Sequence, residues 1–267
     1  MTPPPAGHAV ALPCTARVVE LRELTGAVER TVNATSTSAA VTLLDGICLP
    51  RRDGPAATTA ALPAADRDRL LLAAHRRAFG DRIEATVRCR ACRSPFDLDF
   101  TLSALETALD AAGPPEALPD ADGWYSVAGY GRFRLPTGAD EIAVAGLDGT
   151  AGVAELVRRC VPEPHPGFDP DGFQDLLGRL APLADLDLDC ACPECGTGQP
   201  VHFDIQSYFL SALLADRRRL VLDVHRLACA YRWSHREILE LPRAERRALV
   251  ALVEAQPAAP SRSWRLS

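Results

Sequence analysis

The chain has 267 residues, 47% of them hydrophobic, and a formal net charge of -6 from 29 basic and 35 acidic residues. This length and apolar content are sufficient for one large buried core or two modest ones. The acidic balance disfavours general nucleic-acid binding, because contacts with phosphates supply most of the affinity of such proteins.

Neither the N-terminus nor any apolar segment indicates export or membrane insertion. Residues 1–5, MTPPP, lack the basic and apolar regions of a signal peptide, and no apolar run approaches the length of a membrane span. We therefore expect a cytoplasmic protein, in which thiols stay reduced. Under those conditions, nine cysteines with paired spacing indicate metal binding rather than disulfides.

The N-terminal region is predicted to be a disordered leader followed by short elements. Pro and Ala dominate the leader, residues 1–15. A strand or extended segment, two helices and a polar linker are predicted to follow it, at 16–24, 27–32, 38–47 and 50–59.

A longer helix is predicted over residues 66–79, DRDRLLLAAHRRAF. It opens with Asp66 as an acidic cap, and Gly80 follows where a C-terminal cap belongs. The helix leads directly into the first of two cysteine pairs, so we expect helix and cysteines to form one packed unit.

Each cysteine pair lies between two segments with strand periodicity. Apolar and polar residues alternate at 83–88 and 95–100 around Cys89-x-x-Cys92, and at 186–189 and 200–205 around Cys192-x-x-Cys195. Period-two alternation predicts half-buried strands, so each pair is predicted to form the tip of a β-hairpin. The second pair is followed by Gly196, which can take a positive φ, whereas Arg93 fills that place in the first.

The segment between the hairpins, residues 101–184, is predicted to be a long insertion with its own elements. A helix at 103–112 is capped by Ser103 with Glu106 three residues later. Beyond a loop at 114–122, a hairpin at 125–135 and helices at 149–161 and 171–180 are predicted to follow.

After the second hairpin the pattern is helical. Apolar residues recur at three- and four-residue spacing from 207 to 231, which predicts one long amphipathic helix. Ser234 and Glu237 match a capping box that opens a short helix, and Pro242 can begin the last one. Residues 257–267 are expected to be a flexible tail.

Cys89, Cys92, Cys192 and Cys195 are predicted to hold one structural Zn²⁺. Zinc favours four thiolates in a tetrahedron, and a two-residue spacer lets one tight turn present two sulfurs to the same ion. A redox pair is disfavoured because neither motif opens a helix in a βαβ unit. Cys190 is an alternative to Cys192, since both fall on the same face of a strand. The remaining cysteines are interpreted as small core residues: Cys14, Cys48, Cys160 and Cys229.

These elements together predict an α+β fold, mostly helical, with a split zinc-ribbon-like pair of hairpins. Residues 16–256 are predicted to form a single domain that the metal fastens, with the insertion at 101–184 projecting between the two hairpins.

Three stretches stand out: LPAADRDRLLLAAHRRAFGDRIEATVRCRAC, the second cysteine motif followed by FDIQSYF, and DVHRLACAYRWSHREIL with the arginine-rich helix after it. Together they resemble the T-even-type phage baseplate family. The resemblance covers roughly 62–100 and 185–252, and departs from the family at Arg93 and in the long insertion. The family also accompanies contractile injection systems, and some of its members are described as baseplate hub assembly chaperones.

The resemblance implies a non-enzymatic structural or assembly protein that binds other baseplate or tail proteins, without nucleic-acid, membrane or small-molecule partners. It also implies that the cytoplasmic protein can be incorporated into a particle. The alternative is a zinc-ribbon module with a nucleic-acid-binding or regulatory role. Acidic residues along the ribbon, including Asp97, Asp99 and Asp187, argue against it. A metal-dependent hydrolase is disfavoured because four cysteines leave no coordination position for water.

Overall fold

The structure is a computed structural model that describes residues 7–50, 58–111, 117–164 and 167–255. Within these ranges the fold is α+β. About half of it is helical, and the strands form four two-stranded antiparallel hairpins. The predicted fold class is therefore confirmed, including the two hairpins that carry the cysteine motifs. The predicted tail at 257–267 and most of the linker at 50–59 lie outside the described residues.

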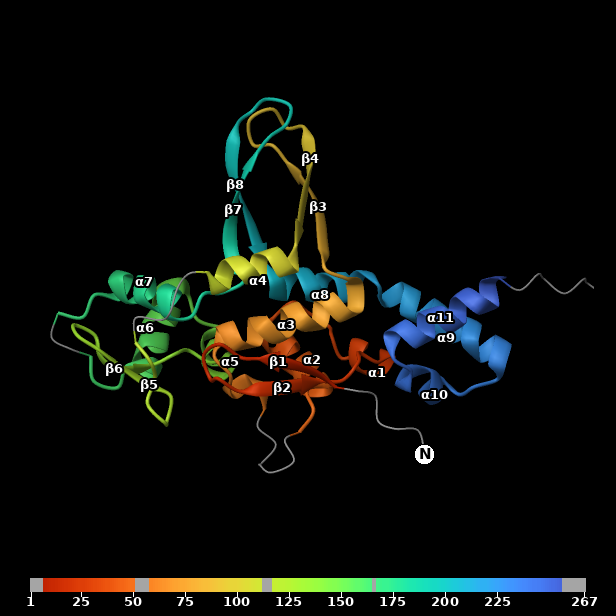
Figure 1. Ribbon diagram of the computed structural model, residues 1–267, viewed down its shortest axis with the longest axis horizontal. Coiled ribbons are helices and arrows are strands. Elements are labelled where there is room, and N and C mark those ends of the chain that lie inside the picture. Colours follow the sequence, from red (N-terminus) through yellow and green to blue (C-terminus); the bar gives the residue numbers. More distant parts are fainter. Residues whose placement is uncertain (1–6, 51–57, 112–116, 165–166, 256–267) are drawn as a thin grey trace, which may run out of the picture.

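The central body forms around two helices, α3 (Ala64–Phe79) and α8 (Ile205–Ala215). The His75 ring of α3 lies 5.5 Å from the Phe209 ring of α8, measured between centroids. Their shared apolar core also includes buried side chains from the N-terminal hairpin and from helix α2. In Figure 1 this hairpin and α2 lie on the side of α3 opposite the two cysteine hairpins. The N-terminal elements are β1 (His8–Ala11), β2 (Val18–Leu21), α1 (Gly26–Glu29), α2 (Thr37–Ile47) and η1 (Thr59–Ala61).

The N-terminal region differs from its prediction in two ways. The leader assigned to residues 1–15 contains strand β1, because His8–Ala11 pairs with Val18–Leu21 and buries Val10 and Leu12 in the core. Asp66 does not cap α3, whose N-cap is Pro63. Its buried carboxylate instead accepts hydrogen bonds from the backbone N–H groups of Cys14 (2.8 Å) and Thr15 (3.1 Å). Asp66, predicted to cap its own helix, therefore connects α3 to the turn after β1.

Two hairpins stand out from the body side by side, and Figure 1 shows them at the top of the molecule. The first is β3 (Arg82–Arg88) with β4 (Pro95–Thr101), and the second is β7 (Asp185–Ala191) with β8 (Gly198–Asp204). We call them the paired hairpins. Near the body they meet through Phe100 and Phe203, whose ring centroids are 5.0 Å apart.

The paired hairpins are two copies of one unit at a constant offset. Cys192 follows Cys89 by 103 residues (192 − 89), and all four strand boundaries of the second hairpin follow those of the first by the same number. At the C-terminal end of each hairpin a side chain caps a helix: Thr101 for α4 (Leu102–Asp110) and Asp204 for α8. The hairpin and the start of its following helix therefore repeat without insertion or deletion. Thr101, not the predicted Ser103, caps α4.

The segment between the hairpins forms a second apolar cluster. Its aromatic residues pack on one another, with ring centroids 5.5 Å apart for Tyr125 and Phe133 and 5.0 Å apart for Phe133 and Phe173. The predicted hairpin and two helices are present, and an unpredicted helix, α5, lies between them. The elements are β5 (Trp124–Val127), β6 (Gly131–Arg134), α5 (Gly138–Val144), α6 (Gly149–Cys160) and α7 (Pro170–Leu180).

The predicted single helix over 207–231 is wrong. The chain forms α8 and α9 (Arg217–Tyr231), which meet at Asp216. The Asp216 carboxylate forms ion pairs with Arg243 and Arg247 of α11 (Arg243–Ala255), so a tertiary contact occupies the break. The capping box at Ser234 is confirmed, and it opens α10 (His235–Glu240).

A buried ionic network joins the C-terminal helices to the N-terminal region. Glu29 of α1 accepts hydrogen bonds from Arg243 and Arg246 of α11, each at 2.6 Å, and all three side chains are buried. The Arg243 guanidinium also lies over the Phe79 ring, 4.4 Å from its centroid. A Cβ at Gly26 would come within 2.9 Å of the Arg246 guanidinium, so glycine leaves the room that this side chain occupies.

None of the described helices is long and apolar enough to cross a membrane.

We expect Glu29→Ala to lower the free energy of unfolding by about 3–5 kcal/mol, because it removes the buried carboxylate to which the buried Arg243 and Arg246 both donate. Urea unfolding followed by circular dichroism measures this. Glu254→Ala is the matched control, since Glu254 pairs with Arg226 at an exposed position, and its cost should stay below about 1 kcal/mol. Equal effects of the two substitutions would contradict the importance of the network.

Asp68 gives an expected pH dependence. Burial raises the pKa of this carboxyl to about 7, and its Oδ2 accepts a hydrogen bond from the Ala184 N–H at 3.0 Å. Because the folded pKa exceeds the unfolded one, the folded state holds the proton more tightly, and stability falls as the pH rises from about 4 to 7. Asp68→Asn removes the free-energy cost of burying the ionised carboxylate. It should therefore stabilise the protein relative to wild type at pH 8, and the gain in stability should be smaller at pH 5. Paired urea titrations measure the difference, and a difference independent of pH would contradict the assignment.

Candidate metal centre

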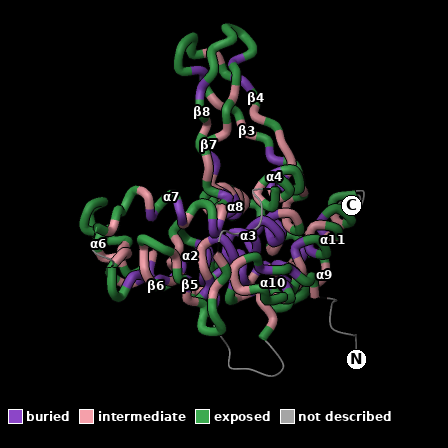
Figure 2. Tube along the Cα trace, turned by 60° about the vertical axis from the view of Figure 1, so that its left-hand side comes forward, coloured by how far each residue is buried: buried purple, intermediate pink, exposed green. Residues whose placement is uncertain are grey.

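The four predicted cysteines meet at the tips of the paired hairpins. The Sγ atoms of Cys89, Cys92, Cys192 and Cys195 all lie within 4.8 Å of one another. Cys89 Sγ is 3.6 Å from Cys195 Sγ, and Cys92 Sγ is 3.7 Å from Cys192 Sγ, so each close pair joins one hairpin to the other. Figure 2 shows the tip well away from the body, with exposed turns around short buried segments.

These distances fit a tetrahedral thiolate site. Metal–sulfur bonds of about 2.3 Å in a tetrahedron place the sulfurs about 3.8 Å apart. Disulfide sulfurs, at about 2.05 Å, are far closer than the sulfurs in this cluster. Four thiolates in such an arrangement are consistent with a structural metal ion such as Zn²⁺.

The two turns that present the cysteines have the same backbone geometry. In the first turn Cys89 N–H donates to Ser94 C=O and Arg93 N–H donates to Cys89 C=O. Equivalent bonds link Cys192 with Thr197 and Gly196 in the second turn. Arg93 has φ 66° and Gly196 has φ 72°, so arginine takes the left-handed conformation that glycine takes in the other copy. The sequence difference between the two motifs therefore leaves the turn unchanged.

The four thiols differ in exposure. Cys89 and Cys192 are buried and face Phe96, whereas Cys92 and Cys195 are exposed. A hydrogen bond with the Thr197 hydroxyl (3.3 Å) lowers the pKa of Cys195 to about 6, and a backbone hydrogen bond from Ser94 lowers the pKa of Cys92. Burial raises the pKa of Cys192 to about 11. The exposed sulfurs thus favour the thiolate form that binds metal.

Cys190 lies beside the cluster but is not part of it. The group of converging thiols contains Cys192, and Cys190 packs at its edge as a half-buried apolar side chain. In the repeat, Cys190 corresponds to Val87, which has the same place at the edge of the cluster. Because valine, which cannot bind metal, fills this position in the first copy, we interpret Cys190 as a packing residue and not as a metal ligand.

One residue that the sequence did not single out connects the two tips directly. Gln199 of β8 is buried, and its amide bonds to the first hairpin: Arg90 N–H donates to Oε1 at 2.7 Å, and Nε2 donates to Arg88 C=O at 3.3 Å. These two backbone groups flank Cys89. No sequence pattern marks a lone glutamine in a strand as a partner of a motif about 110 residues earlier.

The other cysteines follow their prediction only in part. Cys160 is buried, and Cys14 and Cys48 are half-buried, but Cys229 is exposed on α9, so its assignment to the core is wrong. The reason is that Cys229 falls outside the face of α9 that carries the buried Leu220 and Leu227.

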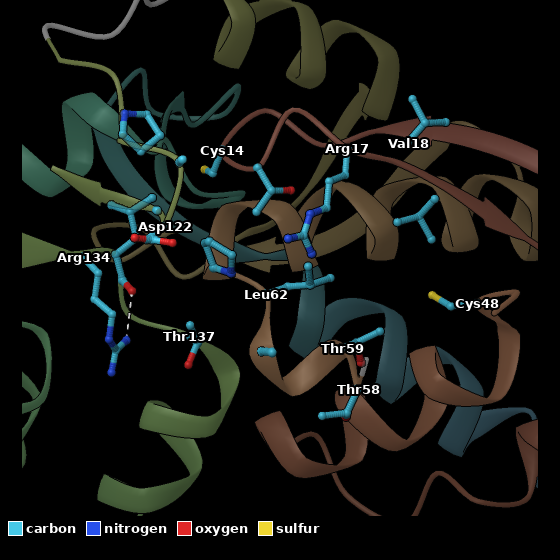
Figure 3. A pocket seen from close by; sticks show the side chains of 18 of the residues that line it. Cys14, Arg17, Val18, Cys48, Thr58, Thr59, Leu62, Asp122, Arg134 and Thr137 are labelled. Atoms are coloured by element: carbon cyan, nitrogen blue, oxygen red, sulfur yellow. Dashed lines mark hydrogen bonds between the residues drawn. The ribbon is translucent and has the colours of Figure 1, made fainter. Parts of the chain in front are cut away.

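Cys14 and Cys48 line a cavity of about 950 Å³ between the N-terminal hairpin and the inserted segment, shown in Figure 3. Burial raises the pKa of both thiols, that of Cys48 to about 12, so they are protonated at neutral pH. Of the charged side chains in the lining, Arg134 is paired with Asp140 (2.9 Å), and Asp45 accepts a hydrogen bond from the Thr59 N–H (2.7 Å). The polar groups named here are already engaged in holding the fold.

Comparison with known proteins finds no matching family model, no matching curated protein and no matching solved structure.

We expect the full-length protein to carry about one zinc per chain, as measured by elemental analysis after purification without chelator. Cys192→Ser and Cys195→Ser should each remove most of the metal, because a three-thiolate site binds zinc more weakly. Cys190→Val should retain it. Cys229→Ser, an exposed cysteine on α9, is the control and should also leave the zinc content unchanged. Loss of zinc from Cys190→Val together with retention in Cys192→Ser would show that Cys190, and not Cys192, is the ligand.

Proposed function

We propose that this chain is a non-enzymatic zinc protein whose metal fastens two distant parts of the fold. The observation that carries the proposal is the approach of four thiols from two hairpins to tetrahedral spacing. Four cysteine ligands complete the coordination of zinc and leave no position for a reacting water, so the ion has a structural role. Binding of zinc then contributes its free energy to folding.

We further propose that the protein is a structural or assembly factor of the baseplate of a contractile phage-like particle or injection system. Support comes from the stretches that resemble the T-even-type baseplate family. The first covers α3, β3 and the first cysteine motif, the second covers the second cysteine motif and the start of α8, and the third covers the latter part of α9 with α10 and α11. The rings of Phe79 on α3 and Phe209 on α8 are 6.1 Å apart, and the Arg243 guanidinium of α11 lies over the Phe79 ring, so the three stretches contact one another.

The mechanism in this proposal is binding alone. The paired hairpins project from the body, and the C-terminal helices carry the exposed apolar side chains Val221 and Leu222 on α9 and Leu252 on α11. These side chains are available for contact with another protein. The partners would be other baseplate or tail proteins in the cytoplasm or in the finished particle.

A combined particle and pull-down experiment tests this function. Tagged full-length protein is expressed in the host with the genes of the particle, and mass spectrometry is applied both to purified particles and to proteins captured from the cytosol. We expect baseplate or tail subunits to be enriched with wild type and lost with Cys92→Ser/Cys195→Ser. Presence in particles identifies a component, and capture with unassembled subunits only identifies an assembly factor. Absence of every tail protein from both fractions would refute the proposal.

A zinc-ribbon nucleic-acid module is the second candidate, and one observation favours it. Arg88, Arg90 and Arg93 are all exposed at the tip of the first hairpin. Below the tip the charge is opposite, with exposed Asp97 and Asp99 on the first hairpin and aspartates on the second. Filter binding of the full chain to DNA and RNA across salt concentrations separates the candidates. Tight, steeply salt-dependent binding that Arg90→Ala/Arg93→Ala abolishes would favour this second function.

A further inference from the structure

The two copies of the hairpin unit differ at one buried position beside the cysteines. Phe96 in the first copy corresponds to Gln199 in the second, 103 residues later (199 − 96), and both side chains are buried. Phe96 packs against Cys89 and Cys192 in an apolar cluster. A glutamine at the equivalent place buries a polar amide, which costs free energy unless its hydrogen bonds are made.

Those hydrogen bonds are made to the other hairpin. The Gln199 Oε1 accepts from Arg90 N–H at 2.7 Å, and Nε2 donates to Arg88 C=O at 3.3 Å. The amide thus holds the backbone on both sides of Cys89, which lies between these residues. Cys89 is itself buried, and its sulfur is one of the two that approach the opposite hairpin most closely.

This contact differs physically from the thiol cluster. Without a metal the four sulfurs contact one another only weakly, and removing their protons would bring like charges together, so the cluster does little to hold the two tips together until an ion binds. The hydrogen bonds of the Gln199 side-chain amide join neutral groups, and their formation does not depend on a metal. They can therefore hold the two tips in register before metal binds and restrain Cys89 while the metal is bound.

We propose that Gln199 is a positioning residue that holds Cys89 in register with the second cysteine pair and slows release of the metal. The proposal rests on the zinc site proposed above and adds a residue to it that touches no metal. Partners of this kind, which orient the ligands of a metal, typically contribute about 10–100-fold to metal affinity.

The test compares Gln199→Met with wild type in the full-length chain loaded with zinc. Methionine keeps the length and bulk of the side chain but removes both hydrogen bonds. We expect zinc transfer to a chromogenic chelator to be about 10–100-fold faster, while the tetrathiolate absorption of the cobalt-substituted protein keeps its wild-type form because all four cysteines remain. Unchanged release would overturn the proposal.

Gln206→Met is the matched control. Gln206 is half-buried, and its Nε2 donates to Thr35 C=O at 3.1 Å, in the body of the molecule. The chemical change is the same, so its zinc release should equal that of wild type. Equal acceleration by the two substitutions would show a general loss of stability and would contradict a role particular to Gln199.

Amide hydrogen exchange of the wild-type protein, measured by NMR with and without chelator, tests the same idea without a variant. The Arg90 N–H should stay protected in the metal-free protein, whereas the Glu194 N–H, whose hydrogen bond is to the Cys192 sulfur, should exchange rapidly once the metal is removed. Rapid exchange of Arg90 without metal would overturn the proposal even if Gln199→Met fails to fold. A wild-type protein that binds no zinc but protects Arg90 would refute the zinc function and leave this contact standing.

Discussion

The approach of four thiols across the paired hairpins is the constraint on which the rest of the molecule depends. A two-stranded hairpin is marginally stable in water, and each of these has only a narrow apolar face. Phe100 and Phe203 join them near the body, and the cysteines join them again at the tip. The inserted segment runs from the end of the first hairpin to the start of the second, so these contacts bring its ends together. A metal at the tip would close a loop of about a hundred residues, and would lower the conformational entropy of the unfolded chain more than a short link would.

Polar contacts hold the molecule together at the points where apolar ones do not reach. Glu29 connects the first helix to the last through two buried arginines, Asp66 holds the turn after β1, and Asp68 holds the start of β7. Gln199 has the same role between the hairpin tips. Each of these side chains joins segments far apart in the chain, and each would cost free energy if its partner were removed. Such contacts define one arrangement among several that the apolar surfaces alone would permit.

Local patterns were sufficient for the elements whose determinants lie within a few residues. The alternation around the cysteine pairs, the capping box at Ser234 and the helices over 149–161 and 171–180 all agree with the structure. The failures share a cause. Strand β1 exists because it pairs with β2, and the break at Asp216 coincides with ion pairs to arginines about 27 residues away. Helix propensity and periodicity carry no information on such partners.

The sequence by itself determined where the thiol chemistry lies: two Cys-x-x-Cys motifs, each on a tight turn between alternating strands, mark two places that can present sulfurs to one ion, because turn and strand geometry are local. Only the tertiary structure decided between Cys190 and Cys192, since that depends on how one hairpin faces another copy of itself 103 residues away (192 − 89). It also decided that Arg93 takes the conformation of glycine and that the Gln199 amide bonds to the backbone on both sides of Cys89. These outcomes follow from burial and from hydrogen bonds across the pair of hairpins, which exist only once the two tips have met.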